Sequence, residues 1–223
     1  YVKDLSQIQE DLLKYLDENN TDENPDRDNQ NLGTLIGHLN DFEICEDQQE
    51  LDEFLRLLSF IATHHHRTKN FFPKIALILE QLNPHISNYY TNEEIFSIFK
   101  NAEPVIILLN DKHILSFDDE INFIINSPDN KNLKSYYYPE PMENVEENKR
   151  TGENHNLLCT QIRLDLTSDF NMNVGGNNIP LDSKIIPSQF ETNAFLQKKK
   201  DISLLQYAAF CGSIGVFNNI IEK

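Results

Sequence analysis

The stretch Ser203-Leu204-Leu205-Gln206-Tyr207-Ala208-Ala209-Phe210-Cys211-Gly212-Ser213-Ile214-Gly215-Val216-Phe217-Asn218-Asn219-Ile220-Ile221-Glu222-Lys223 decides the fold class of this chain. Ser203 is a favourable N-cap because its hydroxyl accepts a hydrogen bond from a backbone N–H of the first helical turn. Gly212 can adopt the left-handed conformation that ends a helix. Apolar residues then follow at steps of three and four: Val216, Phe217, Ile220 and Ile221. The stretch predicts two short antiparallel helices joined by a tight turn.

A second helix pair is predicted upstream, over residues 157–174, with its turn near Asp165. An offset of 47 residues aligns Asp165 with Gly212, Phe170 with Phe217 and Val174 with Ile221. Each pair resembles an ankyrin repeat, in which a Thr-Pro-Leu-His-x-Ala opening precedes a helix, a Gly and a second helix. The offset is longer than the usual ankyrin period of about 33 residues, so the intervening segment would hold an enlarged finger loop.

The fold class predicted from these patterns is all-α, with helical hairpins stacked as a solenoid-like array and degenerate ankyrin-like repeats at the C-terminus. Residues 1–128 are expected to form an N-terminal helical domain, because every strong period in them is helical. No segment has the alternating pattern of a strand. Apolar spacing predicts helices over residues 4–18, 32–39, 47–65, 70–82, 91–99, 104–109 and 118–125.

Several residues mark helix starts. Thr91 and Glu94 form a capping-box signature. Asn70 is a candidate N-cap, and either Ser116 or Asp118 is another. Residues 19–31 are polar and acidic and are predicted to form a loop.

Residues 129–154 are predicted to be an acidic linker or a long surface loop around the run Tyr136-Tyr137-Tyr138. The tyrosines are interpreted as packing this segment onto neighbouring helices, with a docking epitope as the alternative. Residues 155–223 would hold the repeats, the last over 202–223. Because the chain begins at Tyr1 and stops directly after one repeat-like unit, we expect a truncated array within a longer protein.

The composition limits the class of protein. A hydrophobic content of 39% with 14 Phe and 8 Tyr predicts a globular chain. The net charge of −17 disfavours nucleic acid and anionic membranes, which attract basic proteins, and would suit a basic partner or simply solubility. Cys45, Cys159 and Cys211 have no paired spacing, which predicts a reducing, cytoplasmic location. Cys159 and Cys211 lie on predicted helices and are interpreted as small core residues. No apolar run approaches the ~20 residues that cross a bilayer.

Five further motifs carry a resemblance that covers nearly the whole chain. They are His65-His66-Arg67 before Asn70-Phe71-Phe72, Tyr137-Tyr138-Pro139-Glu140, Thr151-Gly152-Glu153-Asn154, Glu191-Thr192-Asn193-Ala194-Phe195-Leu196 and Leu205 to Ile214. With them the chain resembles a family of protist ankyrin-repeat proteins that have an all-helical N-terminal domain of unknown function. The resemblance implies a protein-binding ankyrin array without established enzymatic activity. Gln206 stands where the ankyrin pattern has His, and Leu204 stands where it has Pro.

The run His64-His65-His66 is the strongest candidate for chemistry. Neighbouring positions on a helix differ by about 100°, so three consecutive histidines do not converge on one metal ion. We interpret them as capping or packing residues at a helix C-terminus, where protonated histidine is favoured. The chain contains no GxSxG or GxxxxGK[ST] motif, and no metal or cofactor is predicted.

The main hypothesis is therefore a non-enzymatic interaction scaffold that binds another protein. Its candidate partner-binding residues are Phe195, Gln197, Lys198, Lys199, Lys200, Asp201, Gln206 and Tyr207. The alternative for the run Lys198-Lys199-Lys200 is a solvated charge cluster that contacts no partner. One alternative is an α-helical enzyme or effector domain that uses the His64–His66 region. Another is a structural N-terminal cap of a longer ankyrin array.

Overall fold

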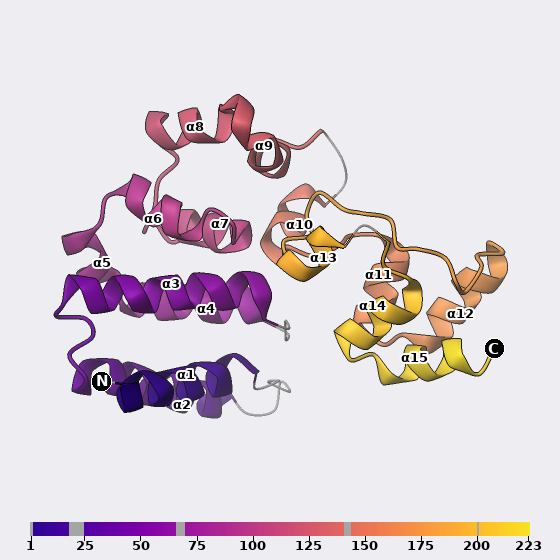
Figure 1. Ribbon diagram of the computed structural model, residues 1–223, viewed down its shortest axis with the longest axis horizontal. Coiled ribbons are helices and arrows are strands. Elements are labelled where there is room, and N and C mark those ends of the chain that lie inside the picture. The colour runs from indigo at the N-terminus through magenta and orange to yellow at the C-terminus, as the bar shows by residue number, and fades with distance from the viewer. Residues whose placement is uncertain (1, 18–24, 66–69, 141–143, 200) are drawn as a thin grey trace. The chain divides into compact units, whose positions relative to one another are not determined.

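The chain folds into α-helices that form two compact units, Tyr1–Tyr137 and Tyr138–Lys223 (Figure 1). The computed structural model describes residues 2–17, 25–65, 70–140, 144–199 and 201–223. No β-strand occurs in these ranges, which confirms the all-α prediction. The boundary between the units falls inside the predicted linker segment 129–154.

The first unit consists of helices that pack in successive pairs, α1 with α2, α3 with α4, α6 with α7 and α8 with α9. Their bounds are α1 (Val2–Asp17), α2 (Pro25–Asp41), α3 (Gln48–His64), α4 (Phe71–Gln81), α5 (Asn83–Tyr89), α6 (Asn92–Phe99), α7 (Glu103–Asp111), α8 (Asp119–Asn126) and α9 (Lys131–Tyr137), with a 3-10 turn at Pro128–Asn130. Each pair also packs on the next, because α3 contacts α6, α4 contacts α7, and α6 contacts α8.

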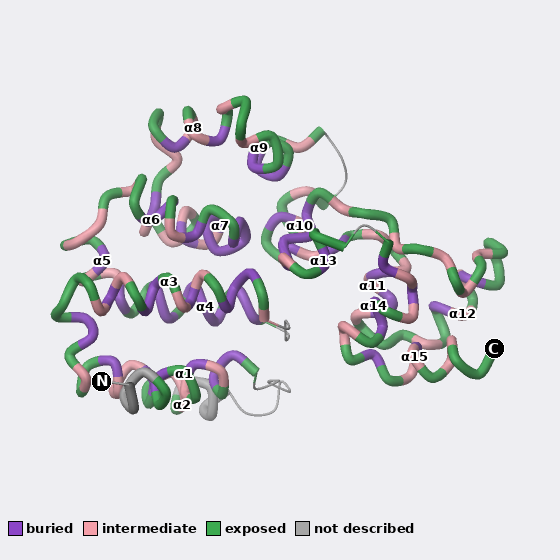
Figure 2. The backbone as a smooth tube through the Cα atoms, viewed as in Figure 1, coloured by how far each residue is buried: buried purple, intermediate pink, exposed green. Residues whose placement is uncertain are grey.

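Helix α4 is the centre of this unit and contacts α1, α2, α3, α5 and α7. Most of its residues are buried (Figure 2), as expected for a helix that packs against several others. They are Phe71, Phe72, Lys74, Ile75, Ala76, Ile78 and Leu79. The Lys74 ammonium is accommodated because Nζ donates to the Tyr15 carbonyl at 2.8 Å and lies 5.1 Å from the centre of the Tyr15 ring.

The helix starts follow the predicted caps, with one exception. The Thr91 hydroxyl accepts from the Glu94 backbone N–H at 3.3 Å, and the Glu94 carboxylate accepts from the Thr91 N–H at 2.8 Å, so the capping box is confirmed. Asp118 caps α8 by accepting from the Ile121 N–H at 3.0 Å. Asn70 adopts a left-handed φ of 64° and makes no side-chain cap hydrogen bond, which corrects its predicted role.

Two predicted loops are partly helical. Residues 25–31 belong to α2, whose first residue is Pro25, and a proline φ is compatible with a first helical turn. The segment 129–154 contains α9 and α10 (Val145–Thr151), which corrects the linker prediction. Packing explains α9, because Tyr136 and Tyr137 are buried, as the packing interpretation of the tyrosine run expected, whereas Tyr138 is exposed.

The second unit contains two helix hairpins, and one packs on the other. Helix α11 packs on α12 and α14 on α15, while α11 also contacts α14 and α12 contacts α15. The helices are α10, α11 (Leu157–Arg163), α12 (Thr167–Gly176), α13 (Ala194–Lys198), α14 (Leu204–Cys211) and α15 (Ile214–Ile221). Their core is Cys159, Ile162, Phe170, Val174, Leu196, Ile202, Leu204, Tyr207, Ala208 and Val216. Of the apolar residues predicted to form a stripe on the last helix, α15, only Val216 is fully buried, and Ile221 is exposed.

The two hairpin turns have the same backbone structure. Asp165 and Gly212 have positive φ values of 52° and 71°. The Asp165 N–H donates to the carbonyl three residues earlier at 2.9 Å, and the Gly212 N–H does the same at 3.3 Å. In each turn the next N–H donates to the carbonyl five residues before it, at 2.9 and 3.0 Å. These are the paired bonds of a helix C-terminus closed by a left-handed residue.

The segment between the hairpins, residues 177–203, is anchored by short backbone contacts. Lys184 and Ser203 form an isolated antiparallel bridge. The Ile185 N–H donates to the Ile202 carbonyl at 2.8 Å, and the Leu204 N–H donates to the Ser183 carbonyl at 3.1 Å. The enlarged connection between the pairs therefore folds back onto the start of α14 and holds α13 beside it.

Candidate functional site

The predicted partner-binding residues lie on and around α13 and α14 in the second unit. Phe195 is 53% exposed, and Gln197, Lys198, Lys199, Asp201 and Gln206 are also exposed. Lys200 lies outside the described residues. Tyr207 has an exposure of 0%, so its predicted role as a contact residue is wrong. It faces the core because α11 packs on that side of α14.

Tyr207 is part of a buried polar network. The Arg163 guanidinium donates from Nη1 to the Tyr207 hydroxyl at 3.0 Å and to the Asn154 carbonyl at 2.6 Å. Its Nε lies 2.8 Å from the Glu153 carboxylate. Burial raises the pKa of the Tyr207 phenol well above its ordinary value, although the Arg163 charge opposes the rise. The network joins α11 to α14, and we interpret it as stabilising the packing of these two helices.

Two sequence motifs meet beside this network. The Gly152 carbonyl accepts from both the backbone N–H and the hydroxyl of Thr192 at 3.0 Å. The Glu191 carboxylate accepts from the Asn154 N–H at 3.3 Å and from the Asn193 N–H at 2.8 Å. The residues of motifs 151–154 and 191–196 therefore fix the start of α13. The separation of 37 residues between Asn154 and Glu191 hides this contact from the sequence.

The start of α14 is closed by the residue that replaces the ankyrin histidine. The Ser203 hydroxyl accepts from the Gln206 N–H at 3.2 Å, and the Gln206 side-chain oxygen accepts from the Ser203 N–H at 3.1 Å. This capping box confirms Ser203 as the N-cap. The Gln206 side chain is exposed, and its oxygen is engaged in holding the helix start.

Phe210 is the residue of this surface that the sequence reading missed. Its ring stacks on the Phe195 ring with centroids 5.6 Å apart and an interplanar angle of 7°. Lys199 Nζ lies 5.8 Å from the centre of the Phe195 ring. Phe210 follows Gln206 by four residues and so lies on the same helix face. This spacing is the sequence signal from which Phe210 could have been predicted.

His64 and His65 turn to different partners. The His64 ring stacks on Phe60 with centroids 4.2 Å apart, and His65 Nε2 lies 2.7 Å from the Asp17 carboxylate. The capping and packing interpretation therefore fits both residues, while His66 and Arg67 lie outside the described residues. Within the described part of the chain, no group of three or more His, Cys, Asp or Glu side chains is placed to hold a metal ion.

The three cysteines are free thiols, and Cys45 and Cys159 are buried; the core prediction is confirmed for Cys159 and only in part for Cys211. Cys211 is partly buried. Burial raises the pKa of Cys159 and of Cys211 from 9.0 to about 12, so both thiols are protonated at neutral pH. A protonated thiol is a poor nucleophile.

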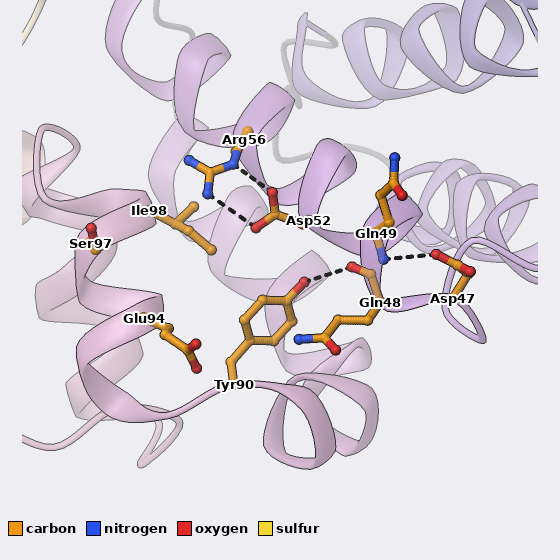
Figure 3. A pocket seen from close by; sticks show the side chains of 9 residues that line it. All are labelled: Asp47, Gln48, Gln49, Asp52, Arg56, Tyr90, Glu94, Ser97 and Ile98. Carbon is orange, nitrogen blue, oxygen red and sulfur yellow. Dashed lines mark hydrogen bonds and ion pairs between the residues drawn. The ribbon is translucent and has the colours of Figure 1, made fainter.

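A groove of about 560 Å³ lies in the first unit between α3 and α6 (Figure 3). It is lined by Asp47, Gln48, Gln49, Asp52, Arg56, Tyr90, Glu94, Ser97 and Ile98. The Arg56 guanidinium donates to both Asp52 oxygens at 2.6 and 3.3 Å, and the Tyr90 hydroxyl donates to the Gln48 carbonyl at 3.2 Å. Burial, with a smaller effect of Asp52, raises the Tyr90 pKa to about 12.

The carboxylates of this groove all serve the fold. Asp47 caps α3 by accepting from two backbone N–H groups, Asp52 pairs with Arg56, and Glu94 closes the capping box of α6. Acid–base chemistry requires a group whose proton affinity is tuned for the task, and Tyr90 is shifted away from neutrality. We therefore assign the groove residues to helix capping and pairing.

Comparison with known proteins adds no relative: no family model, no curated protein and no solved structure matches the chain. Among the described residues, no helix is long and apolar enough to cross a membrane.

Proposed function

We propose that the protein is a non-enzymatic, cytoplasmic interaction scaffold whose C-terminal hairpins are degenerate ankyrin-like repeats that bind another protein. One observation carries the proposal. The turns at Asp165 and Gly212 have equivalent hydrogen bonds 47 residues apart, and α11–α12 stacks on α14–α15 helix against helix. Repeat proteins bury the apolar face of each unit on the next in this way.

The contact between the hairpins includes direct polar links, which supports a repeat unit of fixed geometry. The Asp165 carboxylate accepts from the Gly215 N–H at 3.0 Å and from the Val216 N–H at 2.8 Å, at the start of α15. The Ser213 hydroxyl donates to the Ile162 carbonyl. Close approach is also required at Gly215, where an added Cβ would lie 2.7 Å from Thr167 Oγ1. A rigid stack is a suitable base for a binding surface.

Photo-crosslinking tests whether the second unit contacts another protein. The photoreactive residue p-benzoylphenylalanine replaces Phe195 in one protein and Phe123 in a matched control. Both phenylalanines are exposed, at 53% and 79%, and Phe123 lies in α8 of the first unit. Each protein is illuminated in an extract of the cells that naturally make it. We expect a crosslinked protein adduct from position 195 that is absent from position 123. Identical adduct patterns, or none from position 195, contradict the proposal.

A further inference from the structure

The exposed side chains of Phe195, Lys198 and Lys199 lie beside the half-buried ring of Phe210, and we call these four residues the Phe–Lys surface. The stacked rings of Phe195 and Phe210 leave more than half of Phe195 in water, although burying an aromatic ring is favourable. Lys199 Nζ lies on the Phe195 ring, while Lys198 and Lys199 are both exposed. Exposed aromatic rings beside cations are typical of binding sites for a partner with an apolar anchor and negative charge.

The backbone beneath the Phe–Lys surface is held in place. The Asn193 side-chain oxygen accepts from the N–H groups of Phe195 and Leu196 at 3.0 and 3.4 Å, and Leu196 is buried in the core. The Gln197 amide donates to the Glu191 carbonyl at 2.6 Å. These contacts fix α13 before any partner arrives, which lowers the ordering cost of binding. Gln197 therefore supports the surface.

The two units of this acidic chain differ in net charge. Residues 138–223 carry eight basic side chains against eleven acidic ones, a net charge of −3. Residues 1–137 carry eleven basic side chains against 25 acidic ones, a net charge of −14. Lys198 and Lys199 are both exposed and contribute two positive charges to the Phe–Lys surface. The Phe–Lys surface is thus locally basic on an acidic protein, which favours an acidic occupant there.

We propose that the Phe–Lys surface binds an acidic segment of a partner protein, with an aromatic or large aliphatic side chain of that segment on the Phe195–Phe210 ring pair. Carboxylates of the segment pair with Lys198 and Lys199. This inference rests on the proposed scaffold function and names the partner chemistry of the same unit. Basic segments are repelled by the lysines, and purely polar segments lack the anchor.

A peptide selection on the full chain tests the inference. A library of random twelve-residue phage-displayed peptides is selected on the wild-type protein, and the peptides that remain bound after washing are sequenced. We expect the remaining peptides to be acidic and to contain an aromatic or large aliphatic residue. Phe195→Ala should weaken their binding by about tenfold or more, as for an aromatic anchor at the centre of an interface. Phe123→Ala serves as the control and should leave the affinity unchanged.

A charge-reversal pair tests the role of the lysines. Lys198→Glu with Lys199→Glu should weaken peptide binding by about tenfold, with a smaller effect at high salt, because these charges are exposed. Lys131→Glu with Lys134→Glu in α9 changes the net charge equally and should leave the affinity within about twofold. All four lysines are exposed, so the melting temperatures should match that of the wild type.

Three results overturn the inference. Phe195-dependent peptides that are neutral or basic refute the acidic occupant while leaving the scaffold function standing. Equal effects of the two charge-reversal pairs refute the role of the local lysines in the same way. A selection that yields no Phe195-dependent peptide refutes peptide binding by the Phe–Lys surface. The scaffold function is then tested separately by photo-crosslinking from position 195.

Discussion

The Asp165 carboxylate links the two C-terminal hairpins, and its removal should loosen α15 without affecting the first unit. Its two oxygens accept from the backbone N–H groups of Gly215 and Val216, which lie in the first turn of α15 and have no partner within that helix. Asp165 itself sits in a left-handed conformation at φ 52°. Substitution therefore changes both the cap and the backbone strain.

Three substitutions separate these two effects. Removing a capping carboxylate that accepts two N–H bonds should cost about 2 kcal/mol, within the range for helix caps. Alanine adds about 1 kcal/mol for the left-handed φ, so Asp165→Ala should cost about 3 kcal/mol. Glycine tolerates this φ, so Asp165→Gly should cost about 2 kcal/mol. Asparagine keeps one acceptor oxygen and tolerates the conformation, so Asp165→Asn should cost about 1 kcal/mol.

Hydrogen exchange followed by mass spectrometry measures the effect where it arises. Local opening of α15 should speed exchange of its amides by roughly 100-fold in Asp165→Ala and by roughly fivefold in Asp165→Asn. Amides of α4 belong to the other unit and provide an internal control, and Asp182→Asn provides a matched loss of charge at an exposed position in the connecting segment. Unchanged α15 exchange in all three Asp165 variants, or equal exchange in Asp165→Ala and Asp165→Asn, would refute the cap.

Other predictions concern the same unit. Gly215→Ala should lower stability by about 1–3 kcal/mol because its Cβ meets Thr167 Oγ1, and Thr167→Ala should recover part of the loss in thermal denaturation; additive effects would contradict this contact. Arg163→Gln should lower the free energy of unfolding by about 3 kcal/mol in urea denaturation, because Glu153 loses its ion pair and the Tyr207 hydroxyl loses its donor. A denaturation midpoint equal to that of the wild type would contradict a stabilising role for this network. Because burial raises the pKa of Cys159 and Cys211 from 9.0 to about 12, the native state favours their protonated forms. The contribution of these two thiols to stability should be constant below about pH 9 and be lost between about pH 9 and 12, so the variant with both replaced by Ala should lose less stability than the wild type over that range.

Local chemistry was enough to predict the last hairpin. The hydroxyl of Ser203 and the missing side chain of Gly212 act within one turn of the helix ends they form. Helix α9 was missed because it is stabilised by contacts distant in sequence, since the Tyr137 ring packs on Phe96 and Phe117. Helix α5 was missed because Pro84 suggested a helix end, whereas it occupies the first turn of a new helix.

The candidate surface was predicted only in part, because part of it depends on contacts between residues distant in sequence. The lysine run and Phe195 are visible in the sequence as polar and aromatic residues ahead of a helix. Which face of α14 is buried depends on Arg163, which is 44 residues from Tyr207, and periodicity over eight residues does not resolve it. Tyr207 was therefore assigned to the surface, and Phe210 was left out of it.

The most direct test of the scaffold function is the affinity of the full chain for the protein crosslinked at position 195. The dissociation constant is measured for the wild type, Phe195→Ala and Phe123→Ala, after their melting temperatures have been shown to match. Our account predicts that Phe195→Ala weakens binding by about tenfold or more and that Phe123→Ala changes it by less than about twofold. Equal dissociation constants for the wild type and Phe195→Ala would contradict it.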